Sequence, residues 1–217
     1  MFQSNPFTLI VLFVGLSLLP FVAMVATSYL KIVVVMSLIR NALGIQSIPP
    51  NMVLNALAML LTFYIMAPMM EKSWDSIAES QKAETIQLSA FDMEKAAEPF
   101  RTFLSQHVSD RERAFFVHTA ERLWAQAPDE PATVDPESFT ILIPSFCVSE
   151  LTKAFQIGFL VYLPFIAIDI IVSNILLAMG MMMVSPVTIS LPFKLLLFVM
   201  VDGWTLLVQG LVRGYAI

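Results

Sequence analysis

The sequence predicts an all-α membrane protein in which two hydrophobic helical hairpins flank a small helical soluble insert. Hydrophobic residues fill 58% of the 217 positions and charged residues only 13%, against about 25% charged residues in ordinary soluble domains. Charges are concentrated between residues 71 and 137, where 14 acidic and 7 basic residues give a net charge of −7. Long apolar stretches lie on both sides of this window, which places the membrane part at the two ends of the chain.

Four segments approach the ~20 apolar residues that a bilayer-spanning helix needs, namely residues 7–27, 52–70, 154–179 and 189–212. No basic residue precedes the first segment, so we expect it to be retained rather than cleaved as a secretory signal. The amphipathic stretch at 28–48 follows directly. Together they predict one long helix over 7–43, bent near Pro20, where proline removes a backbone hydrogen bond.

These segments divide the chain into an N-terminal hydrophobic hairpin (1–70), an acidic helical insert (71–138) and a C-terminal hydrophobic hairpin (139–217). Lys31 and Arg40 lie near the first short loop, and Lys194 lies near the second. Loops that carry Lys and Arg tend to stay in the cytoplasm. We therefore expect the insert to lie on the opposite, periplasmic side of the membrane.

The insert is predicted to be helical. Ser109 and Glu112 have the spacing of a capping box, in which the two side chains bond first-turn amides. An apolar helix face is then expected from residues at i, i+4, i+7 and i+8, which are Phe116, Ala120, Leu123 and Trp124. His107 and His118 have no third ligand nearby, so we expect surface histidines, no metal site and no cofactor.

Polar side chains interrupt the apolar segments at a few places, which are Glu150 with Lys153, Asp169 with Ser173 and Asn174, and Lys194 with Asp202. A charged group in hydrocarbon costs at least a few kcal/mol, so such groups normally pair or face protein or water. Prolines in the same segments also need surrounding protein to satisfy the broken backbone. One chain with four short segments cannot supply that much protein, which predicts a large assembly.

Methionine is concentrated at one point, as Met179, Met181, Met182 and Met183 stand directly before the Ser185-Pro186 pair. Consecutive residues point in all directions around a helix, so they cannot all fill one core face. Gly180 and the Ser-Pro pair favour a helix break, which would expose the methionines. Their long, polarizable side chains adapt to irregular partners. Several copies arranged around an axis would form a soft apolar gasket.

The sequence resembles the SctR/FliP family in long motifs that cover roughly residues 8–70 and 139–213. The matching blocks are Leu176 to Pro186, Thr188 to Phe198, Asp202-Gly203-Trp204, Arg40 to Gln46 with Ile48 to Asn51, Ser149-Glu150-Leu151 with Ala154 to Phe159, and Leu163-Pro164-Phe165 with Ile168-Asp169. The insert matches in placement and helical character only. The motifs around Asn41 and Pro50 are more similar to the injectisome branch than to the flagellar branch.

The resemblance implies a helical ring oligomer, with a pentamer expected, at the core of the type III secretion export gate in the bacterial inner membrane. Its implied partners are the SctS-like and SctT-like small membrane proteins of the apparatus, membrane lipid and unfolded secreted proteins. By resemblance, Met181 to Met183 would close the pore, and Glu150 and Lys194 would pair between neighbouring copies. The resemblance also implies that the hydrophobic helices are lifted and tilted toward the periplasm in the assembly.

Two other functions fit parts of the sequence. Asp169 and Asp202, in separate hydrophobic segments, are the residue type that an intramembrane aspartyl protease uses, because two close carboxylates share one proton. The usual Gly-x-Gly-Asp context is absent. The polar face of Asp169, Ser173 and Asn174 would suit the ion path of a small-solute channel. Nucleic-acid binding is not expected, since no basic stripe is present.

Overall fold

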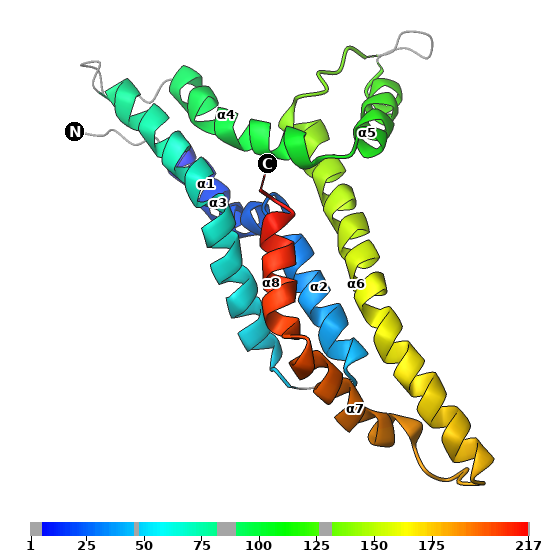
Figure 1. The fold of residues 1–217 in the computed structure, drawn as a ribbon. Coiled ribbons are helices and arrows are strands. Elements are labelled where there is room, and N and C mark those ends of the chain that lie inside the picture. The colour runs from blue at the N-terminus through cyan, green and yellow to red at the C-terminus, as the bar shows by residue number, and fades with distance from the viewer. Residues whose placement is uncertain (1–5, 46–47, 82–89, 126–131, 217) are drawn as a thin grey trace. The chain divides into compact units, whose positions relative to one another are not determined.

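The computed structural model describes residues 6–45, 48–81, 90–125 and 132–216. Within these residues the regular structure is helical throughout (Figure 1). In chain order the helices are α1 (Pro6–Val25), α2 (Tyr29–Ala42), α3 (Asn51–Gln81), α4 (Ala90–His107), α5 (Asp110–Leu123), α6 (Phe139–Ala178), α7 (Pro186–Met200) and α8 (Gly203–Arg213). The predicted all-α class is confirmed.

Two to four helical segments of the described chain can cross a membrane. The single helices long and apolar enough are α3, over Asn51–Ser76, and the whole of α6. Two further spans are possible if each bent helix pair counts as one broken span. These pairs are α1 with α2, and α7 with α8. The chain is therefore a membrane protein, and its four predicted hydrophobic segments correspond to these four candidates.

Helix α6 is much longer than the apolar segment predicted at 154–179. It runs for 40 residues from Phe139, a length of about 60 Å, roughly twice the hydrocarbon thickness of a bilayer. Glu150 and Lys153 lie inside it without ending it, since both residue types favour helices, and they form an ion pair one helical turn apart, at 3.1 Å. The helix must therefore extend beyond the hydrocarbon layer or lie strongly tilted in it.

The prediction of one long helix over 7–43 is wrong. Helix α1 continues through Pro20 and ends at Val25, and the break falls at residues 26–28. There the Thr27 hydroxyl donates a hydrogen bond to the Ala23 carbonyl and accepts one from the Tyr29 amide at 3.3 Å. Such local side-chain bonds offer the backbone an alternative to the helical ladder, which explains a break at Thr27.

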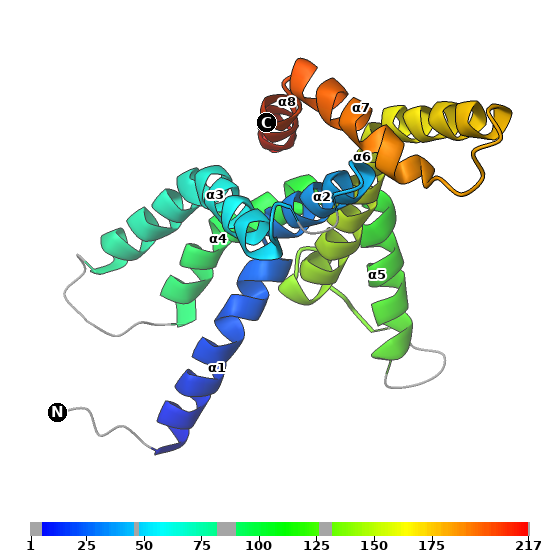
Figure 2. The same cartoon turned by 90° about the horizontal axis from the view of Figure 1, so that it is seen from below.

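The last predicted segment, 189–212, is two helices instead of one. Helices α7 and α8 meet at an angle of 59°, and Figure 2 shows α8 nearly end-on while α7 lies across the view. Asp202 at the junction has a φ of 50°, in the left-handed region that is costly for a non-glycine residue. The next residue, Gly203, has to be glycine, because a Cβ at this position would collide with the Phe198 ring.

The chain forms two compact units that interleave along the sequence, one of residues 1–30 and 68–149, the other of residues 31–67 and 150–217. The first has a core of fully or nearly buried residues from α4, α6 and the end of α1, which are Ala26, Leu104, Val108, Leu142 and Phe146. The second buries one face of α2, including Ile32, Val35, Met36 and Ile39. The second unit contains the methionine-rich turn and the buried lysines Lys31 and Lys194.

Three expectations for the insert need correction. Ser109 is the N-cap of α5, as predicted, but its side chain makes no cap hydrogen bond; its amide donates instead to the Ser149 hydroxyl at 3.0 Å. His107 is buried, with Nδ1 2.8 Å from the Phe103 carbonyl oxygen and its ring 4.5 Å from the Phe103 ring. Of the predicted apolar face, Ala120 is buried, whereas Leu123 and Trp124 are exposed, because both lie in the last turn of the helix or beyond it.

Close packing of α2 on α6 depends on Gly158. A Cβ at this position would lie 3.2 Å from the Leu38 Cβ, which is tight for two carbon atoms. We expect Gly158→Ala to lower stability by about 1–3 kcal/mol through this overpacking, despite the better helix propensity of alanine. The measurement is the thermal unfolding midpoint of the detergent-extracted protein.

Gly15→Ala is the matched control for this change. Gly15 also lies inside a helix, but no described side chain is within 4 Å of the position a Cβ would take. We expect this variant to be unchanged or stabilised by up to about 1 kcal/mol. Equal midpoints for the two variants would show that α2 does not approach α6 closely at Gly158.

Candidate functional site

The methionine loop, residues 179–185, begins where α6 ends (Figure 1). The Met181 amide donates to the Leu176 carbonyl at 2.9 Å and the Gly180 amide to the Leu177 carbonyl at 3.0 Å, the pattern of a Schellman motif. Gly180 has a φ of 73°, which glycine adopts without a steric penalty. Ser185 is the N-cap of α7 and Pro186 its first residue, so the predicted break at this position is confirmed.

Every methionine of this loop is exposed. Met182 is 82% exposed and Met183 fully so, while Met179 and Met181 are 59% and 45% exposed. Large apolar side chains in such positions normally mark an interaction site. The Schellman bonds fix the end of α6, and Pro186 begins α7, although the Ser185 side chain makes no cap hydrogen bond.

Glu150 lies at the centre of a buried ionic cluster. Its side chain is fully buried, and its Oε2 lies 3.0 Å from the Lys31 Nζ, whose own side chain is only 4% exposed. Its Oε1 lies 3.1 Å from the Lys153 Nζ. Tyr215 donates a hydrogen bond from its hydroxyl to Oε2. Two cations and a phenol therefore compensate one buried carboxylate within the chain.

Tyr215 connects the end of the chain to this cluster. The Lys31 Nζ lies 3.5 Å from the centre of the Tyr215 ring, a cation–π arrangement. Burial, reinforced by the Glu150 carboxylate, raises the pKa of the Tyr215 phenol, so it remains a hydrogen-bond donor. The sequence predicts Lys31 near a loop and gives no indication of a role for Tyr215. The position of Lys31 inside an apolar helical run is a sequence signal for a buried charge, whereas no comparable signal marks Tyr215.

A second, partly buried cluster joins α6, α7 and the end of α2. The Lys194 Nζ lies 2.6 Å from the Asp169 Oδ2, and Ser190 donates to the Asp169 Oδ1 at 2.6 Å. Lys194 also donates to the Ala42 carbonyl at 3.2 Å, which belongs to the last residue of α2. A cation is favourable at a helix C-terminus, where carbonyl groups are unpaired. Lys194 thus pairs with Asp169 within the chain, as Glu150 pairs with Lys31.

Two other predicted site residues are not part of these clusters. Asn174 is exposed, although Asp169 on the same helix is bound to Lys194. Asp202 is exposed at the junction of α7 and α8. No interaction joins Asp169 to Asp202 among the residues that the structure describes, and Asp169 is neutralised by a lysine. This is not the proton-sharing pair that an aspartyl protease needs, nor does it leave Asp169 open to line an ion path.

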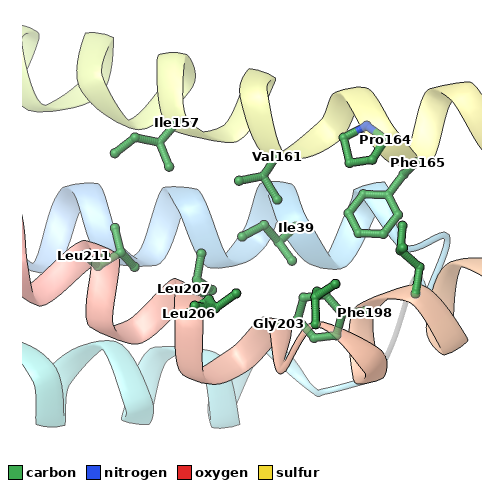
Figure 3. A pocket seen from close by; sticks show the side chains of 13 residues that line it. Ile39, Ile157, Val161, Pro164, Phe165, Phe198, Gly203, Leu206, Leu207 and Leu211 are labelled. Carbon is green, nitrogen blue, oxygen red and sulfur yellow. The ribbon is translucent and has the colours of Figure 1, made fainter.

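An apolar groove of about 500 Å³ opens between α2, α6, α7 and α8. Figure 3 shows Ile39 of α2 facing Ile157 and Val161 of α6, with Leu207 and Leu211 of α8 on the other side. Small residues, among them Gly203 and Gly210, contribute to its wall. The described residues contain no group of three or more His, Cys, Asp or Glu side chains able to hold a metal ion.

Comparison with known proteins agrees with a transport role. The model of the FliP family matches residues 12–211. The chain is 51% identical over 209 residues to the Yop proteins translocation protein R of Yersinia pestis, covering 95% of each chain. It is 46% identical over 212 residues to the hypersensitivity response secretion protein HrcR of Ralstonia nicotianae, covering 96% of each. The flagellar biosynthetic protein FliP of Pectobacterium carotovorum is 41% identical, over 95% of this chain and 77% of that protein. The chain therefore belongs to the FliP family, and it is a component of a type III secretion export apparatus, not an enzyme.

Proposed function

We propose that several copies of this chain, five by resemblance, form a ring whose methionine loops meet around a pore for unfolded secreted proteins. The observation that carries the proposal is the exposure of Met179, Met181, Met182 and Met183 on the loop that joins α6 to α7. Most of the apolar surface of Met182 and Met183 is left uncovered in the single chain. Copies of the loop around an axis would give each methionine an apolar neighbour.

Methionine suits a constriction that must both seal and yield. Its thioether side chain is long, unbranched and polarizable, so it fills irregular gaps and can repack around a passing chain of varied sequence. An apolar constriction also excludes ions, because a narrow apolar passage tends to lose its water. Such a gasket would pass an unfolded polypeptide and close behind it.

The surroundings of the ring are proposed on the same basis. Two smaller membrane proteins, SctS-like and SctT-like, would complete the assembly in the bacterial inner membrane, and the acidic insert at 71–138 would face the periplasm. The hairpins at 1–70 and 139–217 would form the membrane part of the assembly. Many large apolar side chains are exposed in the single chain, which is expected where lipid and other subunits cover them.

The gasket is tested by replacing Met181, Met182 and Met183 together with alanine. The three side chains are exposed, so we expect normal folding and assembly with export largely preserved. Small-ion leakage through cells carrying the apparatus should rise at least ~10-fold, because the shortened side chains no longer fill the constriction. Val187→Ala, an exposed apolar residue on α7, serves as the control. Unchanged leakage in the triple variant would refute the gasket.

A contact between Glu150 of one copy and Lys194 of the next is a further part of the proposal, based on the resemblance. Within the chain each has other partners, so the contact would add to those clusters or replace one of their bonds. If the contact exists, Glu150→Lys combined with Lys194→Glu should export more protein than either single change. A double variant no better than the single variants would remove this contact from the proposal.

A further inference from the structure

Helix α5 carries a row of exposed side chains, here called the α5 stripe, which consists of Arg111, Phe115, His118 and Arg122. They follow at i, i+4, i+7 and i+11, and so lie within about 60° around the helix axis. All four are exposed, Phe115 by 62%. His118 lies 3.5 Å from Glu121, whereas neither arginine has an ion pair or hydrogen bond elsewhere in the described chain. The stripe is a basic edge around an exposed aromatic ring.

The C-terminal part of α3 presents a face of opposite charge, here called the α3 face, which consists of Glu71, Trp74 and Asp75. These residues lie within about 100° around the helix axis. All three are exposed, Trp74 by 72%. Neither carboxylate has an ion pair among the described residues. Lys72 lies about 60° beyond Asp75, at the margin of the face.

We propose that the α5 stripe of one copy docks on the α3 face of the next copy, a contact that repeats around the ring and rests on the proposed ring assembly. Each surface has a large aromatic side chain beside charged groups, and the two charges are opposite. Tryptophan and arginine dominate the binding energy of many interfaces, and opposite charges fix partner and register. Because the two surfaces are different, the contact is head-to-tail, the type that closes into rings.

A protein partner explains these residues better than lipid does. Residues 51–70 of α3 form about 30 Å of helix, the thickness of the hydrocarbon layer, so a copy of α3 that crosses the bilayer would hold Trp74 near the headgroups. A tryptophan there is an ordinary membrane anchor. The carboxylates of Glu71 and Asp75 flank it, however, and anionic headgroups repel them. A second copy supplies both the aromatic ring and the positive charges that this face requires.

Cross-linking tests the contact directly. The chain has one cysteine, Cys147, which donates from its thiol to the Val25 carbonyl at 3.2 Å, so Cys147→Ser keeps a donor. In that background, one copy carries Trp74→Cys and a second copy, with a different tag, carries Phe115→Cys. The two copies are expressed together and extracted in detergent. Their native mass is measured first, and the sample is then oxidised. We expect a disulfide-linked dimer that contains both tags. Leu123→Cys, 74% exposed and about 100° from Arg122 on the same helix, should link to Trp74→Cys at least ~10-fold less.

The outcomes separate this contact from the ring itself. A ring-sized native mass without the mixed cross-link, or Phe115→Cys linking to itself, overturns the docking contact and leaves the proposed function standing. A monomer overturns both. As a second measurement, Arg111→Glu with Arg122→Glu should reduce the ring fraction several-fold, and Glu71→Arg with Asp75→Arg should restore it. An intact ring in the first double variant, with binding to phosphatidylglycerol vesicles lost instead, would assign the stripe to lipid and overturn the proposal.

Discussion

Replacing Glu150 with alanine is expected to lower the stability of the protein by about 3–5 kcal/mol, the cost of removing one partner of a buried ion pair. The change leaves the Lys31 ammonium, on a side chain that is 4% exposed, without its carboxylate. It also removes the acceptor of the buried Tyr215 hydroxyl, which adds a desolvation cost. The thermal unfolding midpoint of the detergent-extracted protein, followed by circular dichroism, measures the effect.

Two controls identify the buried charge as the cause. Lys153 is 39% exposed, so Lys153→Ala should cost less than about 1 kcal/mol, as exposed ion pairs do. Lys31→Met combined with Glu150→Leu removes both charges and should recover most of the lost stability. If Glu150→Ala unfolded at the same temperature as the unchanged protein, the Glu150 carboxylate would not be paired in this way.

The second large effect is expected at the Lys194 cluster, and it should be asymmetric. In Asp169→Asn, the Lys194 ammonium keeps only the Ala42 carbonyl and a neutral amide as partners, although its side chain is just 4% exposed. In Lys194→Met, the group left unpaired is the Asp169 carboxylate, which is 31% exposed. The ammonium is enclosed by the protein, whereas the carboxylate is partly open to the surroundings of the chain. We expect a loss of about 1.5–3 kcal/mol for Asp169→Asn, in the range of hydrogen bonds to charged groups, and a smaller loss for Lys194→Met.

Asn174→Ala is the control for this pair of changes. Asn174 lies on α6 like Asp169, but it is exposed, and such surface changes usually alter stability by less than about 0.5 kcal/mol. The same detergent unfolding assay compares the three variants. A larger loss for Lys194→Met than for Asp169→Asn would contradict the burial assigned to the ammonium group.

The Lys194 cluster also bears on the methionine loop. Asp169 lies on α6 before the loop, and Ser190 and Lys194 lie on α7 after it. Their bonds hold the two helices together on either side of residues 179–185. Residues that position a functional segment in this way act by restricting it. In the proposed ring, loss of the cluster would loosen the methionines as well as destabilise the chain.

Local features of the sequence were sufficient for the class of structure and for the helix ends that have strong chemical signals. Hydropathy and charge distribution predicted helices and a membrane location. Gly180 and Pro186 marked the break around the methionine loop, because each residue has a fixed backbone preference. Pro20 was misleading, since α1 tolerates it and Thr27 breaks the helix instead.

The sequence by itself determined that this chain is a helical membrane protein of the FliP family with a methionine-rich turn between two apolar helices. Only the tertiary structure decided which charges meet, pairing Glu150 with Lys31 and Tyr215, and Lys194 with Asp169 and the end of α2. The reason is physical. Hydropathy and turn preferences act between neighbours in the chain, whereas the partner of a buried charge depends on which distant helices pack together.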